Sequence, residues 1–167
     1  RNFVIVLDTK KELKWPGFVV TSSVDRAFVI ENHKAHTILR PNSAYDLERV
    51  FSRVYREAGW DVCVDEVYMI GTGSIKSFPP SYIRCLTAGR SRSVTVWTLT
   101  QRPKYLPLFA MTESKHVFVF ELGFEDDRKY LLKNVGVDGL EEQVKGHEFL
   151  YYSRPQSRLY KTRLKLS

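Results

Sequence analysis

The sequence alternates between short apolar runs and segments of mixed polarity. Continuous apolar runs of strand length cover residues 2–8, 60–65, 94–100 and 116–122. Runs of this kind are typical of strands that are buried on both faces of a sheet. Three shorter stretches, "GFVVTS", "RAFVIEN" and "HTILRP", predict further strands around the turn signals that the chain places between them.

Helical periodicity is strongest in the segment that follows these short strands. Residues 43–58 predict a helix, because Ser43 with Asp46 resembles a capping box and Gly59 supplies a stop. One face of this helix is apolar and consists of Leu47, Val50, Phe51, Val54, Tyr55 and Ala58.

Two more helices and a hairpin complete the pattern. One helix is predicted from Pro80 to Gly89. Another covers "EDDRKYLLK", where acids at the start and lysine at the end suit the helix dipole. "HEFLYYS" and "RLYKTRLKL" predict a closing antiparallel hairpin around residues 154–157.

Apolar strands that alternate with amphipathic helices predict an α/β fold. We expect a largely parallel sheet with helices on both faces, followed by the C-terminal hairpin. No repeat, low-complexity tract or linker interrupts the pattern, so residues 1–167 are expected to form a single domain. Ligands of such sheets bind at the carboxyl ends of the strands, which is where the chemistry is expected.

Composition narrows the function only slightly. The apolar fraction of 43% is too high for a disordered chain, and no apolar run is long enough to span a bilayer. Cys63 and Cys85 lie in apolar segments without metal-ligand spacing, so we expect buried thiols in a reducing, cytoplasmic compartment. The net charge of +7 suits a partner rich in phosphate, although many basic proteins bind none.

Two adjacent carboxylates, Asp65 and Glu66, end one of the buried runs. A carboxylate in that position can hold Mg²⁺, directly or through water, and a second one beside it can orient and polarise a water molecule. Phosphoryl transfer needs both tasks. The alternative is that Asp65 caps a turn and Glu66 begins a solvated helix, because Asp-Glu pairs are common.

The strand that follows also ends in polar residues. Thr100 and Gln101 can hydrogen-bond a γ-phosphate or the attacking water, whereas a simple turn before Pro103 is the alternative. Arg90 and Arg92 precede this strand and are expected near the active edge of the sheet. A guanidinium there can stabilise a phosphate held by a neighbouring subunit, although a solvated surface residue is the more frequent interpretation.

In their order along the chain, four segments resemble the FtsK–HerA superfamily of P-loop translocases, which includes viral DNA-packaging ATPases. The segments are "FVIVLDTKKE", "VCVDE", "LTAGRSRSVTVWTLTQRPKYLP" and "SKHVFVFEL", and the resemblance spans residues 2–153. It implies a RecA-like core of the ASCE type with ATP and Mg²⁺ as cofactors. It also implies roles for six residues: Asp65 for Mg²⁺, Thr100 for the nucleotide, Glu66 for the attacking water, Gln101 for the γ-phosphate, and Arg90 or Arg92 as an arginine finger acting in trans.

One part of the family pattern is missing. No G-x-x-x-x-G-K-[ST] motif occurs in the chain. "GTGSIKS", residues 71–77, lacks a glycine immediately before Lys76 and follows the wrong strand, so it is not interpreted as a P-loop. The resemblance places the P-loop before the strand at residues 2–8, so we expect it upstream of Arg1 in an N-terminally incomplete domain. The alternative is a degenerate relative that no longer binds nucleotide.

Several basic positions are candidates for contact with nucleic acid. Lys76 lies on a Gly/Ser-rich loop that can face the channel of a ring, although an ordinary solvent loop is an equally good interpretation. Lys161, Arg163 and Lys165 share one face of the last strand, where a nucleic-acid patch competes with a solvated edge protected by charge. The aromatic residues lie mostly within strands and are predicted to be core.

The combined interpretation is a subunit of a pentameric or hexameric ring that hydrolyses ATP to move double-stranded DNA. Viral genome packaging is the expected setting, with a portal or procapsid as a further partner and the host cytoplasm as the location. One rival with the same fold is a secretion or filamentous-phage assembly ATPase. A second rival is a non-catalytic nucleic-acid-binding relative.

Overall fold

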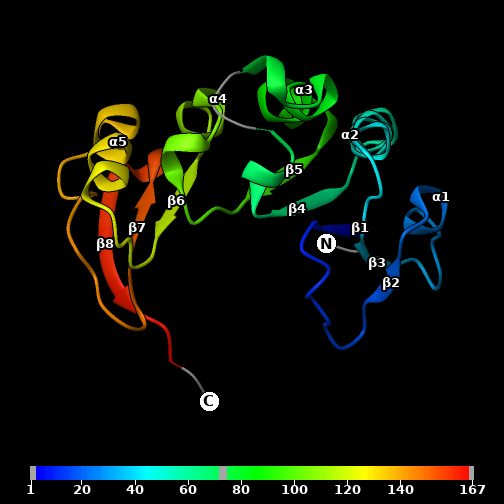
Figure 1. Ribbon diagram of the computed structural model, residues 1–167, viewed down its shortest axis with the longest axis horizontal. Coiled ribbons are helices and arrows are strands. Elements are labelled where there is room, and N and C mark those ends of the chain that lie inside the picture. The colour runs from blue at the N-terminus through cyan, green and yellow to red at the C-terminus, as the bar shows by residue number, and fades with distance from the viewer. Residues whose placement is uncertain (1–2, 72–74, 166–167) are drawn as a thin grey trace. The chain divides into compact units, whose positions relative to one another are not determined.

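The computed structural model describes residues 3–71 and 75–165, and its contacts divide the chain into two compact units (Figure 1). The first unit is Arg1–Thr100 and the second is Gln101–Ser167. The division falls at the end of the apolar run that covers residues 94–100.

A five-stranded parallel sheet forms the centre of the first unit. Its strands are β1 (Phe3–Asp8), β2 (Val19–Thr21), β3 (Ala35–Leu39), β4 (Asp61–Asp65) and β5 (Thr95–Thr98), in the spatial order β2-β3-β1-β4-β5. Every neighbouring pair is parallel, and the register places Asp8 beside Asp65. Because parallel strands end at the same edge, the residues that follow β1, β3, β4 and β5 come together there.

The helices of the first unit pack against one another over the sheet. They are α1 (Val24–Ala27), α2 (Ala44–Glu57) and α3 (Pro80–Ala88), with short 3₁₀ turns η1 (Val67–Met69), η2 (Ile75–Ser77) and η3 (Gly89–Arg92). The predicted start of α2 is confirmed, since the Ser43 hydroxyl accepts a hydrogen bond from the Asp46 backbone N–H at 3.1 Å. The rings of Phe51 on α2 and Tyr82 on α3 lie 5.0 Å apart, and the Tyr82 hydroxyl bonds Thr98 of β5 at 3.0 Å. These contacts fix both helices to the carboxyl half of the sheet.

One predicted strand is wrong. The segment "RAFVIEN" does not extend, because its first residues belong to α1, which begins after Ser23. The Ser23 hydroxyl caps this helix by accepting a hydrogen bond from the Arg26 N–H at 3.3 Å. A tight turn follows, with Glu31 paired to Lys34. The Ser23 cap stabilises a helical turn here, and the pattern of apolar residues does not predict it.

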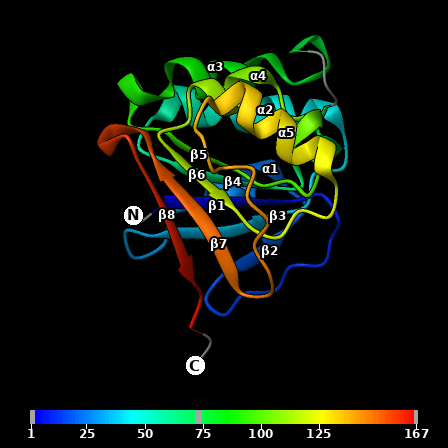
Figure 2. The same ribbon diagram turned by 90° about the vertical axis from the view of Figure 1, so that its left-hand side faces the viewer.

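The second unit holds a three-stranded antiparallel sheet, β6 (His116–Val119), β7 (Glu148–Ser153) and β8 (Arg158–Arg163) (Figure 2). Its helices are α4 (Leu108–Thr112) and α5 (Glu125–Val135), with 3₁₀ turns η4 (Pro103–Tyr105) and η5 (Arg154–Gln156). The closing hairpin is confirmed, because β7 and β8 pair along their whole lengths around η5. Across residues 3–71 and 75–165, no helix combines the length and apolar character that a bilayer crossing requires.

Both cysteines of the first unit are free thiols, with Cys85 buried and Cys63 half-buried. Burial raises the pKa of the Cys63 thiol to about 11, with a further contribution from the charge of Asp65. Burial also raises the pKa of the Cys85 thiol to about 12. A raised thiol pKa means less thiolate at neutral pH, and the thiolate is the reactive form.

We therefore expect both thiols to resist modification in the folded protein. At about pH 8, a thiol reagent such as Ellman's should react on the order of 100-fold more slowly than with an ordinary cysteine, and fully once the chain is unfolded in guanidinium. Cys85→Ser assigns the remaining slow phase to Cys63. Rapid labelling of either thiol in the native protein would contradict their burial in the first unit.

Candidate functional site

Charged and hydroxyl side chains gather where the parallel strands of the first unit end. Asp8 is the last residue of β1, Asp65 is the last residue of β4, and Glu66 directly follows it. Arg40 follows β3 and Thr100 follows β5. The predicted position of the Asp-Glu pair at the carboxyl edge of the sheet is confirmed.

Asp8 anchors the loop that crosses this edge. Its side chain is fully buried and accepts hydrogen bonds from the backbone N–H groups of Glu12 and Leu13, at 3.1 and 3.0 Å. Arg40 donates its Nε to the same carboxylate at 3.0 Å and its Nη2 to the Leu13 carbonyl at 3.1 Å. A buried carboxylate needs such donors, and here they hold the loop after β1 in one conformation.

Glu66 is held from two sides. Only 3% of the residue is exposed, and its Oε2 lies 3.1 Å from the Lys10 Nζ, while its Oε1 accepts from the Thr100 hydroxyl at 3.2 Å. Its backbone is left-handed, with φ 54 and ψ 70. A bond of 2.8 Å from the Val67 N–H to the Leu99 carbonyl fixes the turn that follows. The chain thus accepts an unfavourable backbone conformation to aim this carboxylate.

The electrostatics of the edge follow from these contacts. The hydrogen bond with Glu66 raises the pKa of the Lys10 ammonium, so Lys10 carries its positive charge at neutral pH. Burial raises the pKa of the Asp65 carboxyl, and the charge of Lys10 opposes that shift. The Thr9 hydroxyl donates to the Asp65 carbonyl at 3.2 Å, which ties the β1 loop to the end of β4.

The residues present fit a magnesium ion bound together with a nucleotide. In the part of the chain that the structure describes, no three His, Cys, Asp or Glu side chains converge as a closed metal site. Mg²⁺ is commonly held by one or two carboxylates, several waters and substrate phosphates, so a closed cage is not needed. Asp65, half-buried at the edge, is the residue that would hold it. A bound Mg²⁺ supplies positive charge that neutralises phosphate oxygens.

Comparison with known proteins shows which proteins this chain is similar to. No protein-family profile matches the sequence. Over 77 residues, which are 46% of this chain, the sequence is 39% identical to the DNA packaging ATPase P9 of Enterobacteria phage PRD1. Over this segment the chain is similar to a viral DNA-packaging ATPase. The matched segment covers 32% of the phage protein, so the relationship rests on about a third of that relative's length.

Solved structures show that the fold is shared with packaging ATPases. The genome packaging NTPase B204 from Sulfolobus turreted icosahedral virus 2 matches 98% of this chain and 82% of its own, with a TM-score of 0.80 and 15% identity. The pCW3 conjugation coupling protein TcpA matches 96% of this chain and 51% of its own, with a TM-score of 0.61 and 12% identity. The predicted fold class and the resemblance to viral DNA-packaging ATPases are confirmed.

The polar residues that follow β5 are divided between the two units: Thr100 belongs to the first, and Gln101 and Arg102 belong to the second. Thr100 reaches Glu66, whereas Gln101 is exposed and begins the second unit. Arg102 belongs to the second unit, where its Nε donates to the buried Asp127 at 2.9 Å and its guanidinium lies 4.5 Å from the Phe124 ring. Arg102 therefore stabilises the second unit.

The expected position of the two arginines near the active edge is wrong. Arg90 and Arg92 lie in η3, which precedes β5, so within this chain they are at the amino edge of the sheet, opposite Glu66. Arg90 is exposed. Arg92 donates to the carbonyls of Tyr55 and Arg56, at 3.1 and 2.6 Å, and so caps the end of α2. The helix stop that precedes them puts them on that side, because a helix between two parallel strands returns the chain to the amino edge.

The basic positions predicted to contact DNA are exposed. Lys76 is exposed in η2, and residues 72–74 of its loop lie outside the described residues. Lys161 and Arg163 are exposed on β8 and Lys165 lies just beyond it, while Lys161 is 3.9 Å from Glu142.

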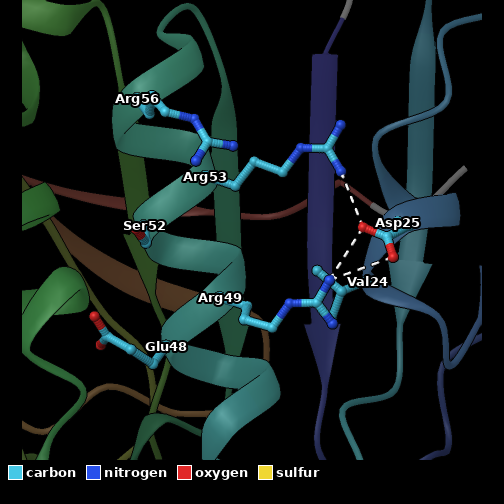
Figure 3. A pocket seen from close by; sticks show the side chains of 7 residues that line it. All are labelled: Val24, Asp25, Glu48, Arg49, Ser52, Arg53 and Arg56. Atoms are coloured by element: carbon cyan, nitrogen blue, oxygen red, sulfur yellow. Dashed lines mark hydrogen bonds and ion pairs between the residues drawn. The ribbon is translucent and has the colours of Figure 1, made fainter.

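A hollow of about 340 Å³ lies elsewhere, between α1 and α2 (Figure 3). Arg49 and Arg53 of α2 converge there on Asp25 of α1, at 3.1 and 3.4 Å. Arg53 also pairs with Glu57 and lies 4.2 Å from the Phe28 ring. These acids offset the guanidinium charges, so the hollow is a contact between two helices and not a phosphate cradle.

Lys10 is the residue of this site that the sequence did not single out, and it generates a prediction. Lys10→Ala should lower the free energy of unfolding by about 1–3 kcal/mol, because it leaves the buried Glu66 carboxylate short of a partner. In a Glu66→Gln background the same change should cost much less, since the amide carries no charge. Urea unfolding of the four proteins measures this coupling.

Lys14→Ala is the matched control, because Lys14 is an exposed lysine of the same loop. It should change the free energy of unfolding by no more than about 0.5 kcal/mol in either background. Equal costs for Lys10→Ala with and without the Glu66 charge would show that the ion pair does not hold the site.

Proposed function

We propose that this chain is an ATP-hydrolysing subunit of a ring motor that moves double-stranded DNA during viral genome packaging. The observation that carries the proposal is the buried Glu66 next to Asp65, held by Lys10 and Thr100 at the ends of parallel strands. The relationship to phage and archaeal-virus packaging proteins supports it. The B204 protein has been solved with ATP-gammaS, at a TM-score of 0.77 and 14% identity, which supports a nucleotide as the ligand of this fold.

The proposed roles follow from position. Asp65 would take part in holding Mg²⁺, and Glu66 would polarise the water that attacks the γ-phosphate. Gln101, which directly follows Thr100, would contact the γ-phosphate. The proposal also needs a phosphate-binding loop, which no motif within the 167 residues supplies.

In this proposal, Lys10 controls whether the Glu66 carboxylate is free to act as the base. Lys10 and Thr100 each engage one Glu66 oxygen, so part of the acceptor capacity of this carboxylate is already used. A nucleotide phosphate near the edge would compete for the Lys10 ammonium, because a phosphate carries more negative charge than one carboxylate. Release of Lys10 would then free Glu66 when substrate is bound.

The proposed partners are double-stranded DNA, neighbouring copies of the chain in a pentameric or hexameric ring, and a viral portal or procapsid. The proposed location is the cytoplasm of the host. If the basic charge contacts phosphate, affinity for duplex DNA should fall steeply with salt and depend little on sequence. Hydrolysis that duplex DNA stimulates would favour the packaging motor over an assembly or secretion ATPase. Absence of nucleotide binding in the full-length protein would favour a non-catalytic relative.

The role of Glu66 is tested by substitution in the full-length protein. Glu66→Gln should retain Mg²⁺-dependent ATP binding and nearly abolish hydrolysis, because the amide preserves the shape but loses the charge. Phosphate release measures hydrolysis, and a fluorescent ATP analogue measures binding. Glu113→Gln, an exposed acid of the second unit, should hydrolyse ATP normally. Near-normal turnover by Glu66→Gln would eliminate the proposed base.

The arginine finger is tested by mixing subunits. Arg90 is the stronger candidate for a role in trans, because it is exposed while Arg92 caps α2. Arg90→Ala should lower turnover by about 10³-fold or more with little effect on ATP affinity. Mixed with Glu66→Gln protein, it should regain some hydrolysis, since some interfaces then combine an intact Glu66 with an intact arginine.

Arg92→Ala is measured in the same way, and Arg84→Ala provides an exposed arginine of α3 as the control. Labelled subunits verify that the rings exchange. If exchange occurs and no activity returns for either arginine, neither residue acts across the interface.

A further inference from the structure

The two units of the chain are joined by residues 100–102, which we call the connector. Thr100 is the last residue of the first unit, and Gln101 is the first residue of the second. Segments between compact units are usually flexible, rich in glycine or small polar residues, and crossed by few contacts. The connector has no glycine, and Pro103 follows it directly. Because proline restricts the residue before it to extended conformations, Arg102 adds little freedom to the connector.

The first end of the connector is attached to the proposed base. The Thr100 hydroxyl donates to the Glu66 Oε1 at 3.2 Å, and only 3% of Glu66 is exposed. The preceding residue, Leu99, is bound on both sides of the Asp-Glu pair. Its N–H donates to the Val64 carbonyl at 3.0 Å, and its carbonyl accepts from the Val67 N–H at 2.8 Å. A shift of this end would therefore disturb both the Glu66 carboxylate and the turn that follows it.

The second end is attached to a buried carboxylate of the second unit. Asp127 on α5 is 1% exposed. Its Oδ2 accepts from the Arg102 Nε at 2.9 Å, and its Oδ1 accepts from the Lys104 N–H at 3.2 Å. The Arg102 guanidinium lies 4.5 Å from the Phe124 ring, and the Arg102 carbonyl accepts from the Tyr105 N–H at 3.0 Å. Because a buried carboxylate requires donors, this end of the connector is held as well.

Two buried carboxylates, one in each unit, are thus bound by residues only two positions apart. A chain extends by at most about 3.6 Å per residue, so a connector of three residues has little length with which to absorb a displacement. Breaking either attachment costs free energy, because it leaves a buried charge short of a donor. A displacement at one end of the connector is therefore passed on to the other end.

We propose that Asp127, acting through Arg102, is a positioning residue for Glu66. The ion pair holds the connector in place, and the connector keeps the Thr100 hydroxyl on the Glu66 carboxylate. When the connector is displaced, Thr100 withdraws and the carboxylate changes its orientation. The catalytic consequence rests on the role proposed above for Glu66, whereas the link between the two carboxylates can be measured without nucleotide.

The link is tested by amide hydrogen exchange on the full-length protein without nucleotide, followed at Val67 in the turn after Glu66. One glycine inserted between Gln101 and Arg102 leaves both attachments possible but slackens the connector. The insertion should speed exchange of the Val67 N–H by roughly 2- to 30-fold, the range expected for energetic coupling between distant groups. Arg102→Gln, which removes the second attachment, should act in the same way.

Arg128→Gln is the matched control, because Arg128 donates to the Leu122 carbonyl within the second unit and lies outside the connector. It should speed exchange in the second unit and leave Val67 unchanged. Thr100→Val should reproduce the effect of the insertion, whereas Thr100→Ser keeps the hydroxyl and should retain the original rate. Unchanged exchange at Val67 in the insertion protein, or equally faster exchange at every protected amide of the chain, would overturn the proposal.

Hydrolysis by the full-length protein separates the link from the proposed function. The glycine insertion should lower kcat by about 10-fold or more, because a small misplacement of a catalytic group is costly. It should leave the KM for ATP nearly unchanged, since Glu66 acts on the water and not on nucleotide binding. Arg128→Gln should hydrolyse ATP at the original rate. A full-length protein without ATPase activity would refute the proposed function, while exchange at Val67 still decides the link. Normal kcat in the insertion protein, beside an active unsubstituted protein, would refute the positioning role.

Discussion

The first unit depends on the pairing of buried negative charge at the carboxyl edge of its sheet. Asp8 is fully buried and Glu66 is 3% exposed, and a buried carboxylate is tolerated only when donors surround it. The donors come from distant segments: Arg40 for Asp8, Lys10 and Thr100 for Glu66. The hydrogen bonds to these two carboxylates fix the segments that follow β1, β3, β4 and β5. Those segments form the candidate site.

The same requirement bears on the proposed phosphoryl transfer. A carboxylate whose backbone the fold already holds in place needs little reorganisation when a cation or a water molecule is added. Asp65, half-buried beside the paired Glu66, offers a charge for Mg²⁺ without a closed cage. Asp65 and Glu66 therefore lie in different environments, the first half-buried and the second buried.

The second unit handles its polar and apolar residues differently. An antiparallel sheet can leave one face to solvent, and here the outward face carries rings in place of the usual polar residues. Leu140 and Val144 are buried in this unit, as are Val119, Leu150 and Tyr152 of the sheet. The half-buried Arg102 pairs with the buried Asp127 and fixes the start of the unit. The unit therefore has a core of its own.

The sequence by itself determined the elements whose signals are local: the buried strands, the capped α2, the closing hairpin and the Asp-Glu pair at a strand end. Periodicity, caps and turns act over a few residues, so they can be recognised without the fold. Only the tertiary structure decided that Lys10 pairs with Glu66 across 56 positions, that Arg92 caps α2 at the opposite edge, and that Phe118 faces outward. Those facts depend on which strands become neighbours and on which side of each strand is covered, and a linear pattern of apolar residues is the same for either side.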